Sequence, residues 1–348
     1  MRLSYCDDST PGITRARVRH GWAYYGPDGA RITDRDEIDR LNAVGLPPAY
    51  TDAWYCPKAN GHIQAVGWDD KGRKQYRYHA GYREKRDAAK YDRCADFGHA
   101  LGRLCKTVAA DLRKRSLSKD RAVAAVVRLL DAGHIRVGNE SYAKDNKSFG
   151  ATTLLKRHAK VSGQTLKLQF KAKSGKLCTL TMTDGSLRRF VKKMLDVDDQ
   201  HLFAWLDDAG EAHPVTSSDV NSYIRAATGE DFTAKHFRTW AASATAFEAL
   251  ATADHDISLK TMLAPVTEKL GNTPAIARKS YVHPALIALV KQGQTRFREK
   301  LKLPRAAGGL SAVERGLIAY LEKTGLEKTG LEKTGLEKTG APALAKAA

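Results

Sequence analysis

The spacing of apolar residues along this chain changes near residue 80, and this change limits the folds that the chain can adopt. Before this point, apolar residues occur in short alternating runs bounded by turn-forming residues, a pattern typical of β-strands. Trp22–Tyr25 leads into a Gly-Pro-Asp-Gly turn, and His62–Trp68 and Gln75–His79 flank an Asp-Asp-Lys-Gly turn as the arms of a hairpin. We therefore predict a small β-rich domain over residues 1–81.

From about Tyr82 onward, apolar residues recur with the period of an α-helix. After Ser118, a suitable N-cap, four of them fall at i, i+3, i+4 and i+7. These four are Val123, Val126, Val127 and Leu130. Gly133 stands where the left-handed residue that ends a helix is expected. One hairpin interrupts the helical pattern, with alternating runs at 166–171 and 178–182 on either side of a Ser-Gly turn.

The end of the chain has a different character. Beyond about Arg305 it carries four copies of LEKTG and an Ala-rich end. A period of five residues fits neither a packed helix nor a solenoid unit, so we expect a solvated, partly helical tail over 305–348. The predicted fold class is α+β, with a β-rich domain at 1–81 and a mainly helical catalytic domain at 82–304 that contains the β-hairpin.

The chain is strongly basic, with 58 Lys and Arg against 39 Asp and Glu, a net charge of +19 over 348 residues. The positive charge is concentrated in three segments, 71–90, 101–121 and 156–176, and the last of these contains no acidic residue. A solvated basic surface would account for one such segment. Three segments, the first interleaved with tyrosines, favour double-stranded DNA as the partner.

Several classes of protein are disfavoured by the sequence. The longest apolar runs fall far short of the roughly 18 residues that a membrane helix needs, and no signal segment opens the chain. Five scattered cysteines give no disulfide framework and no paired zinc motif. We expect a cytoplasmic, nucleoid-associated monomer that requires neither metal nor cofactor and does not bind a membrane.

No phosphate-binding GxxxxGK[ST] loop and no HExxH motif occurs in the sequence. What remains are isolated cations at expected turns and helix ends, followed by a tyrosine. They are Arg136 in HIRVGNESY, Lys173 in FKAKSGK, Arg238 in KHFRTW and Tyr281 in LGNTPAIARKSYVHP.

These four segments, in this order, resemble the catalytic segments of type IB DNA topoisomerases of the small bacterial and poxvirus kind, which share the eukaryotic topoisomerase I catalytic core. The resemblance runs from about Ala59 to His283 and includes GRKQYRYH and RVGNESYAKDNKSFGATTL. It implies two lobes that clamp duplex DNA and relax supercoils through a 3′-phosphotyrosyl intermediate, with strand swivel and religation.

Residue chemistry fits these implied roles. Two guanidinium groups, on Arg136 and Arg238, suit the non-bridging oxygens of a phosphorane-like transition state. Tyr281 is the expected nucleophile, because a phosphotyrosyl ester conserves the energy of the broken bond and religation then needs no ATP. Lys173 is the expected general acid for the departing 5′-hydroxyl, although Ala172 replaces the glycine of the family's FxGK.

The resemblance also assigns residues with supporting roles. Asn272 stands where family members usually carry histidine, and it can donate a hydrogen bond but cannot carry charge. Gln75, Tyr76 and Tyr78 match residues that contact the major groove. Tyr142 and Lys235 match residues that line the cleavage pocket.

Each position also has a purely structural interpretation. Arg136 could satisfy helix-end carbonyls, Lys173 could be a solvated turn lysine, and Tyr281 could be a core aromatic. Arg238 could pair with Glu230 or Asp231, and His134, His236 and His283 are expected to be structural.

Two functional alternatives stay open. A tyrosine recombinase or integrase uses a similar residue set but normally has histidine where this chain has Lys235. A non-catalytic basic DNA-binding protein would explain the charge alone.

Overall fold

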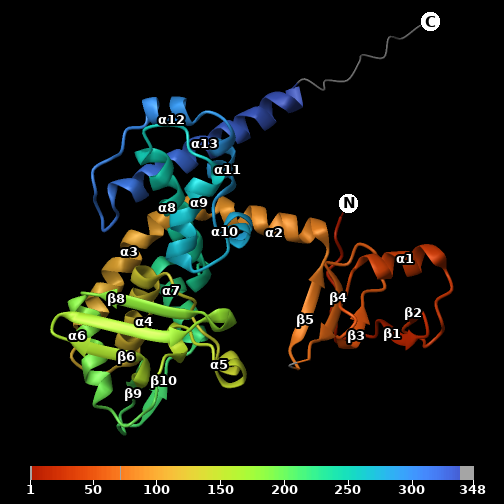
Figure 1. The fold of residues 1–348 in the computed structure, drawn as a ribbon, viewed down its shortest axis with the longest axis horizontal. Coiled ribbons are helices and arrows are strands. Elements are labelled where there is room, and N and C mark those ends of the chain that lie inside the picture. The colour runs from red at the N-terminus through yellow and green to blue at the C-terminus, as the bar shows by residue number, and fades with distance from the viewer. Residues whose placement is uncertain (1, 71, 338–348) are drawn as a thin grey trace, which may run out of the picture. The chain divides into compact units, whose positions relative to one another are not determined.

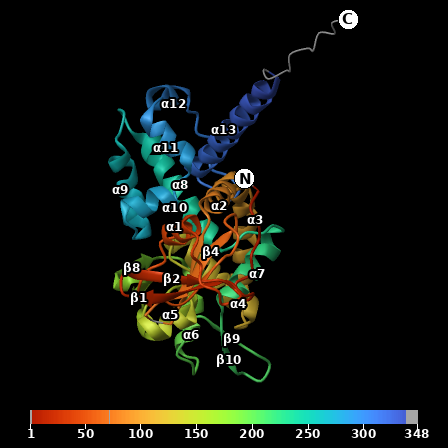
Figure 2. The same ribbon diagram turned by 90° about the vertical axis from the view of Figure 1, so that its right-hand side faces the viewer.

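The computed structural model describes residues 2–70 and 72–337, and at positions 84, 85, 87–90, 141, 142 and 326–337 it describes the backbone alone. The chain divides between residues 90 and 91 into two compact units (Figures 1 and 2). The first unit carries an antiparallel sheet and the second is mostly helical, so the fold is mixed α/β.

The first unit is built on a five-stranded antiparallel sheet with the order β2-β1-β3-β4-β5. Its strands are Ile13–Val18 (β1), Gly21–Tyr25 (β2), Thr51–Tyr55 (β3), Ile63–Trp68 (β4) and Lys74–Tyr78 (β5). Helix α1, Arg35–Ala43, contributes Leu41 to a core that also contains Ile13 and Tyr55. The hairpin expected around Asp69–Gly72 joins β4 to β5, so the strands predicted for this region are confirmed.

The second unit contains most of the helices, and α2, Ala80–Asp92, runs across the boundary. The remaining helices are Cys94–Arg113 (α3), Lys119–Gly133 (α4), Glu140–Asn146 (α5), Gly185–Leu195 (α6), Ser217–Thr228 (α7), Ala234–Thr252 (α8), Leu259–Leu270 (α9), Pro274–Ser280 (α10), Pro284–Lys291 (α11), Gln294–Lys300 (α12) and Ala312–Glu337 (α13). Two small sheets complete it: Ala159–Ser162 (β6), Thr165–Lys171 (β7) and Leu177–Met182 (β8) form one, and Ala204–Leu206 (β9) and Ala212–Pro214 (β10) the other.

Helix α4 lies at the centre of the second unit, and ten of its fifteen residues are buried. The predicted apolar face is there, but alanines on the other faces let α3, α6, α7 and α8 pack closely around the helix as well. The helix ends one residue later than expected. Gly133 is still helical, and His134 takes the left-handed conformation at φ 50° and ψ 22°. Histidine is among the non-glycine residues that tolerate this region.

Two further expectations need correction. The predicted hairpin is present as β7 and β8, but a third strand, β6, extends it into a three-stranded sheet. The segment after Arg305 is not wholly solvated, because α13 buries Leu317, Ile318 and Leu321 in the core of the second unit. The LEKTG period did not predict this burial, because Leu317 and Ile318 precede the repeats and Leu321 is only their first residue.

Candidate active site

Arg136 lies directly after α4, in a segment fixed by its backbone. The amide of Ala151 donates to the Arg136 carbonyl at 2.9 Å, and the amide of Thr152 donates to the Val137 carbonyl at 2.7 Å. A Cβ atom at Gly150 would lie only 2.7 Å from the Arg136 carbonyl oxygen. Glycine at position 150 therefore permits the close approach that sets the backbone of Arg136.

Arg238 projects from the first turns of α8 and is only 4% exposed. Its Nη1 donates to the His134 carbonyl, and its Nη2 donates to the Leu270 carbonyl at 3.0 Å. These carbonyls belong to the C-terminal ends of α4 and α9, where partial negative charge compensates a buried cation. Burial lowers the pKa of Arg238, and the neighbouring charge of Arg136 lowers it further, while Tyr281 opposes the shift.

The expected alternative partners of Arg238 are engaged elsewhere. Glu230 forms an ion pair with Arg93 at 2.5 Å, and Asp231 forms one with Arg225 at 3.2 Å. The interpretation in which Arg238 pairs with either of these carboxylates is therefore wrong. Instead it is Arg238, rather than Arg136, that satisfies helix-end carbonyls.

Tyr281 ends α10 and is half-buried beside Arg238, whose guanidinium carbon lies 5.0 Å from the centroid of the phenol ring. Ser243 of α8 fixes the backbone on both sides of the tyrosine. Its Oγ donates to the Tyr281 carbonyl at 3.4 Å and accepts from the amide of His283 at 3.1 Å. The same helix therefore positions both the tyrosine and the arginine beside it.

The surroundings of Tyr281 favour its phenolate. Burial alone raises the pKa of Tyr281, but the charge of Arg238 and its hydrogen bond to the phenol, together with the charges of Arg136 and Lys173, outweigh burial. The net effect is a pKa below the ordinary value of 10. Three cations predicted from separate segments thus act on the predicted tyrosine.

Asn272 lies in the short connection between α9 and α10 and is 9% exposed. Its Oδ1 accepts a hydrogen bond from Nη2 of Arg136 at 2.9 Å. Its Nδ2 is buried and has no hydrogen-bond partner among the described residues. The asparagine therefore holds Arg136 with one atom and presents an unused donor with the other.

Lys173 occupies the turn between β7 and β8, with its side chain exposed. The amide of Ala172 donates to the Lys176 carbonyl at 2.7 Å, and the left-handed residues are Ser174 and Gly175. Ala172 itself has φ −88°, which any residue can adopt, so the missing glycine at this position costs the turn nothing.

The described residues include no group of three or more His, Cys, Asp or Glu side chains that could hold a metal ion. Within the same part of the chain, no helix is both long and apolar enough to cross a membrane.

Two family models match the chain, and together they span most of it. A model of the catalytic core of eukaryotic DNA topoisomerase I matches residues 79–284, and a model of the N-terminal domain of bacterial DNA topoisomerase IB matches residues 21–69. The chain belongs to the type IB DNA topoisomerase family.

Individual relatives cover most of the chain. DNA topoisomerase 1B of Acanthamoeba polyphaga mimivirus is 30% identical over 285 residues, which span 78% of this chain and 85% of the relative. DNA topoisomerase 1B of vaccinia virus (strain Copenhagen) is 22% identical over 272 residues, spanning 74% and 83%. Among solved structures, the XerH site-specific recombinase bound to its difH substrate is 19% identical and covers 57% of this chain and 49% of that chain. Its TM-score of 0.36 is too low to establish a common fold.

The remaining residues expected from the type IB topoisomerase resemblance lie on several elements. Gln75, Tyr76 and Tyr78 are on β5 of the first unit, where the two tyrosine rings stack at 5.8 Å and Gln75 donates to Asp69 at 3.0 Å. Lys235 is exposed on α8, one turn before Arg238. Tyr142 lies in α5, and its side chain is outside the described part of the molecule.

Sequence reasoning missed Ser243, which holds the expected nucleophile of this type IB topoisomerase. The available signal was a serine within the Ala-rich stretch Ala241–Ala246 of the helix, since a buried hydroxyl needs a partner. Its two partners lie 38 and 40 residues away, so the sequence does not indicate what those partners are.

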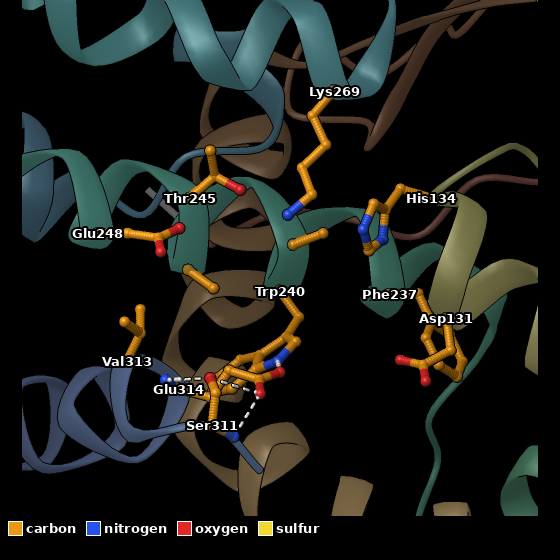
Figure 3. Close-up of a pocket in the computed structure, with 12 residues that line it drawn as sticks. Asp131, His134, Phe237, Trp240, Thr245, Glu248, Lys269, Ser311, Val313 and Glu314 are labelled. Carbon is orange, nitrogen blue, oxygen red and sulfur yellow. Dashed lines mark hydrogen bonds between the residues drawn. The ribbon is translucent and has the colours of Figure 1, made fainter. Parts of the chain in front are cut away.

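A cavity of about 260 Å³ lies along α8, where Phe237 and Trp240 line it. In Figure 3, His134 and Lys269 point toward it from the ends of α4 and α9, and Glu314 borders it from the start of α13. Glu314 also accepts a hydrogen bond from Nε1 of Trp240 at 3.0 Å. Burial, followed by the charges of Lys269 and Arg238, lowers the pKa of His134 to about 4. The imidazole is therefore neutral, which fits the structural role expected for it.

Proposed function

We propose that this type IB topoisomerase relaxes supercoiled DNA through attack of Tyr281 on a phosphodiester, in line with the departing 5′-oxygen. The attack forms a 3′-phosphotyrosyl ester and frees a 5′-hydroxyl end, which swivels before the reverse reaction seals the strand. The observation that carries this assignment is the position of Tyr281, which is half-buried with its ring centroid 5.0 Å from the guanidinium carbon of Arg238, a cation that lowers the pKa of the phenol. A phenol held in this way supplies the nucleophile that transesterification needs.

Arg136, Arg238 and Asn272 are proposed to stabilise the transition state. The two guanidinium groups would bind the non-bridging oxygens, and Nδ2 of Asn272, buried and unused, would donate to one of them. The Leu270 and His134 carbonyls support this role, because they orient Arg238 before substrate arrives. Preorganised donors of this kind contribute about 10²–10³-fold each to the rate.

Lys173 is the proposed general acid for the 5′-hydroxyl. Its place at an exposed hairpin tip supports this role, because the ammonium group there is open to a bound substrate. Lys171, Lys176 and Lys235 are the alternatives if another residue supplies the proton. The bond energy stays in the phosphotyrosyl ester, so the cycle is expected to need neither ATP nor a metal ion.

The two units are proposed to clamp duplex DNA as a monomer, with Gln75, Tyr76 and Tyr78 contacting the major groove and Tyr142 and Lys235 lining the cleavage pocket. The net charge of +19 supports binding through phosphate contacts. We expect the protein to work on the nucleoid in the cytoplasm, where its substrate lies.

Relaxation of a supercoiled plasmid in EDTA without ATP tests this function. The wild-type chain should relax the plasmid, and Tyr281→Phe should bind DNA but neither relax it nor form a covalent complex. Unchanged supercoils with the wild-type chain would instead indicate a non-catalytic DNA-binding protein, and recombinant products would indicate a recombinase. A covalent complex with Tyr281→Phe would show that another residue attacks.

A further inference from the structure

A second concentration of positive charge lies at the opposite end of α4 from Arg136. A pocket of about 450 Å³ opens between the end of α3, the loop 114–118, the first turn of α4 and one face of α6. Seven lysines and arginines line it against a single carboxylate, Asp196. Because α4 has fifteen residues, about 22 Å separate its two ends. In Figure 1, α6 lies on the left side of this unit, and α5 and α10 lie further to the right.

The innermost cation of this pocket is Arg121, which is 4% exposed. Its Nη1 donates to the carbonyls of Arg115 at 2.9 Å and Ser116 at 3.2 Å, which anchors the loop. Lys193 of α6 donates to the same Arg115 carbonyl at 2.9 Å. Burial lowers the pKa of Arg121, and the charge of Arg189 lowers it further. Arg121 and Lys193 thus converge on one backbone carbonyl, and neither forms an ion pair with a residue that the structure describes.

Most of the remaining cations around the rim of the pocket have no carboxylate partner; the exception is Lys114, which pairs with Asp111 at 2.7 Å and Asp120 at 3.0 Å. Arg189 and Lys192 lie three residues apart on α6, so they share the face that borders the pocket. Neither of them, nor Arg113 or Arg115, forms an ion pair with any residue that the structure describes. Like charges brought together in this way repel one another, so a bound anion would stabilise the arrangement.

We propose that this pocket binds a chain of linked phosphate groups, either inorganic oligophosphate or the triphosphate part of a nucleotide. The guanidinium groups offer planar pairs of donors that match phosphate oxygens. The pocket volume falls within the range of about 300–1,000 Å³ that small ligands occupy. A duplex is a stiff rod whose phosphates lie on a convex surface, so it can touch the rim but does not reach the recessed Arg121. A short, flexible phosphate chain can reach both.

Calorimetric titration of the full chain with sodium triphosphate tests the proposal. The variant Arg189→Ala/Lys192→Ala removes two exposed cations of the rim, and Lys291→Ala/Lys300→Ala removes two exposed cations elsewhere as the matched control. We expect the dissociation constant to rise at least about tenfold in the rim variant, since charge-assisted hydrogen bonds are lost, and to stay near the wild-type value in the control. Equal weakening in both variants would mean diffuse attraction and would overturn the proposal.

A parallel titration with ATP separates the two sources of the phosphate chain. Tighter binding of ATP than of triphosphate assigns the site to nucleotides, and equal or weaker binding assigns it to free oligophosphate. If the rim variant unfolds, Arg113→Gln/Arg115→Gln tests the same pocket from the opposite wall.

Titration with short DNA duplexes tests whether this pocket binds nucleic acid instead. If Tyr281→Phe already saturated with one short duplex binds a second one, and the rim substitutions abolish that second binding while triphosphate binding is unaffected, the surface serves nucleic acid and the proposal is wrong. Plasmid relaxation by the rim variant should match the wild type, so the outcome here is independent of the proposed catalytic mechanism.

Discussion

Asn272 holds Arg136 through a hydrogen bond of 2.9 Å from Nη2 to Oδ1, while its own Nδ2 stays buried without a partner in the described structure. A neutral amide therefore does two things at once at a position where the family resemblance implies histidine. It orients a guanidinium and leaves one donor available for a phosphate oxygen.

Replacing Asn272 separates these two contributions. Asn272→Ala should slow single-turnover cleavage by about 10²–10³-fold, because it removes a donor and releases Arg136. Asn272→His should keep most of the activity and add a pH dependence, with faster cleavage as the pH falls and the imidazole gains charge. A pH profile of the histidine variant that is identical to that of the wild type would show that position 272 does not contact the phosphate.

The lowered pKa of Tyr281 sets the pH dependence of the wild-type enzyme. Cleavage should rise with pH as the phenol ionises and level off below pH 10. In Arg238→Ala the main opposing cation is gone and burial dominates, so the pKa of Tyr281 should rise above its ordinary value. Difference absorbance titration against the matching Tyr281→Phe chains measures the shift. Arg225→Ala, which removes an exposed arginine on α7, should leave it unchanged.

Ser243 should act by positioning. Ser243→Ala removes two hydrogen bonds that fix the backbone around Tyr281, so cleavage should slow markedly while DNA binding stays near normal. The free energy of unfolding should fall by about 0.5–1.5 kcal/mol for each bond lost. Thr252→Ala removes an exposed hydroxyl from the same helix and serves as the control. Equal cleavage rates in the two variants would rule out a positioning role.

The role of Lys173 as general acid can be tested by changing the leaving group of the substrate. Lys173→Ala should slow cleavage of an ordinary phosphodiester far more than cleavage of a substrate with a 5′-bridging sulfur, because a thiolate departs without a proton. The defect of Arg136→Ala should persist on both substrates, since charge develops on the non-bridging oxygens in either case. If Lys173→Ala is equally slow on both, the lysine acts by electrostatics or positioning.

His134 makes stability depend on pH. Its pKa is about 4 in the folded chain against 6.5 as the ordinary value, so the unfolded chain binds the proton more readily. The contribution is complete above pH 6.5 and is lost as the pH falls toward 4, by up to about 3 kcal/mol. Denaturant unfolding at about pH 7 and pH 5 measures it. In His134→Asn, which still tolerates the left-handed conformation, the slope should flatten, whereas His255→Asn at the surface should retain it.

Local sequence patterns predicted much of the fold. Alternation and turn residues located β2, β4 and β5 of the first unit and the hairpin that carries Lys173, because these patterns depend on neighbouring residues, but they did not locate β1 or β3. The residue with left-handed backbone conformation after α4 was predicted at the wrong position. Gly133 is the better candidate from local sequence, but it is still helical, and His134 adopts the left-handed conformation. The burial of α13 depends on distant residues such as Trp240, and no local period reports that.

The sequence likewise predicted some of the candidate site residues but not the contacts that hold them. Arg136, Lys173, Arg238 and Tyr281 were found through the joint resemblance of four segments. The sequence could not tell that Arg238 is held by the carbonyl of Leu270, or that Ser243 holds Tyr281, because backbone carbonyls and a lone serine carry no motif.

Two residues that contact Arg238 are synthesised after it. One of its two carbonyl partners, Leu270, lies 32 residues further along the chain, and Tyr281 comes later still. A nascent chain on the ribosome therefore acquires its DNA-attracting cations first, the support for its buried arginine next and its expected nucleophile last. A chain that ends before Tyr281 would lack both the expected nucleophile and the core residues that α11 and α13 supply, among them Leu286 and Leu317, so it should be unable to complete the core of the second unit.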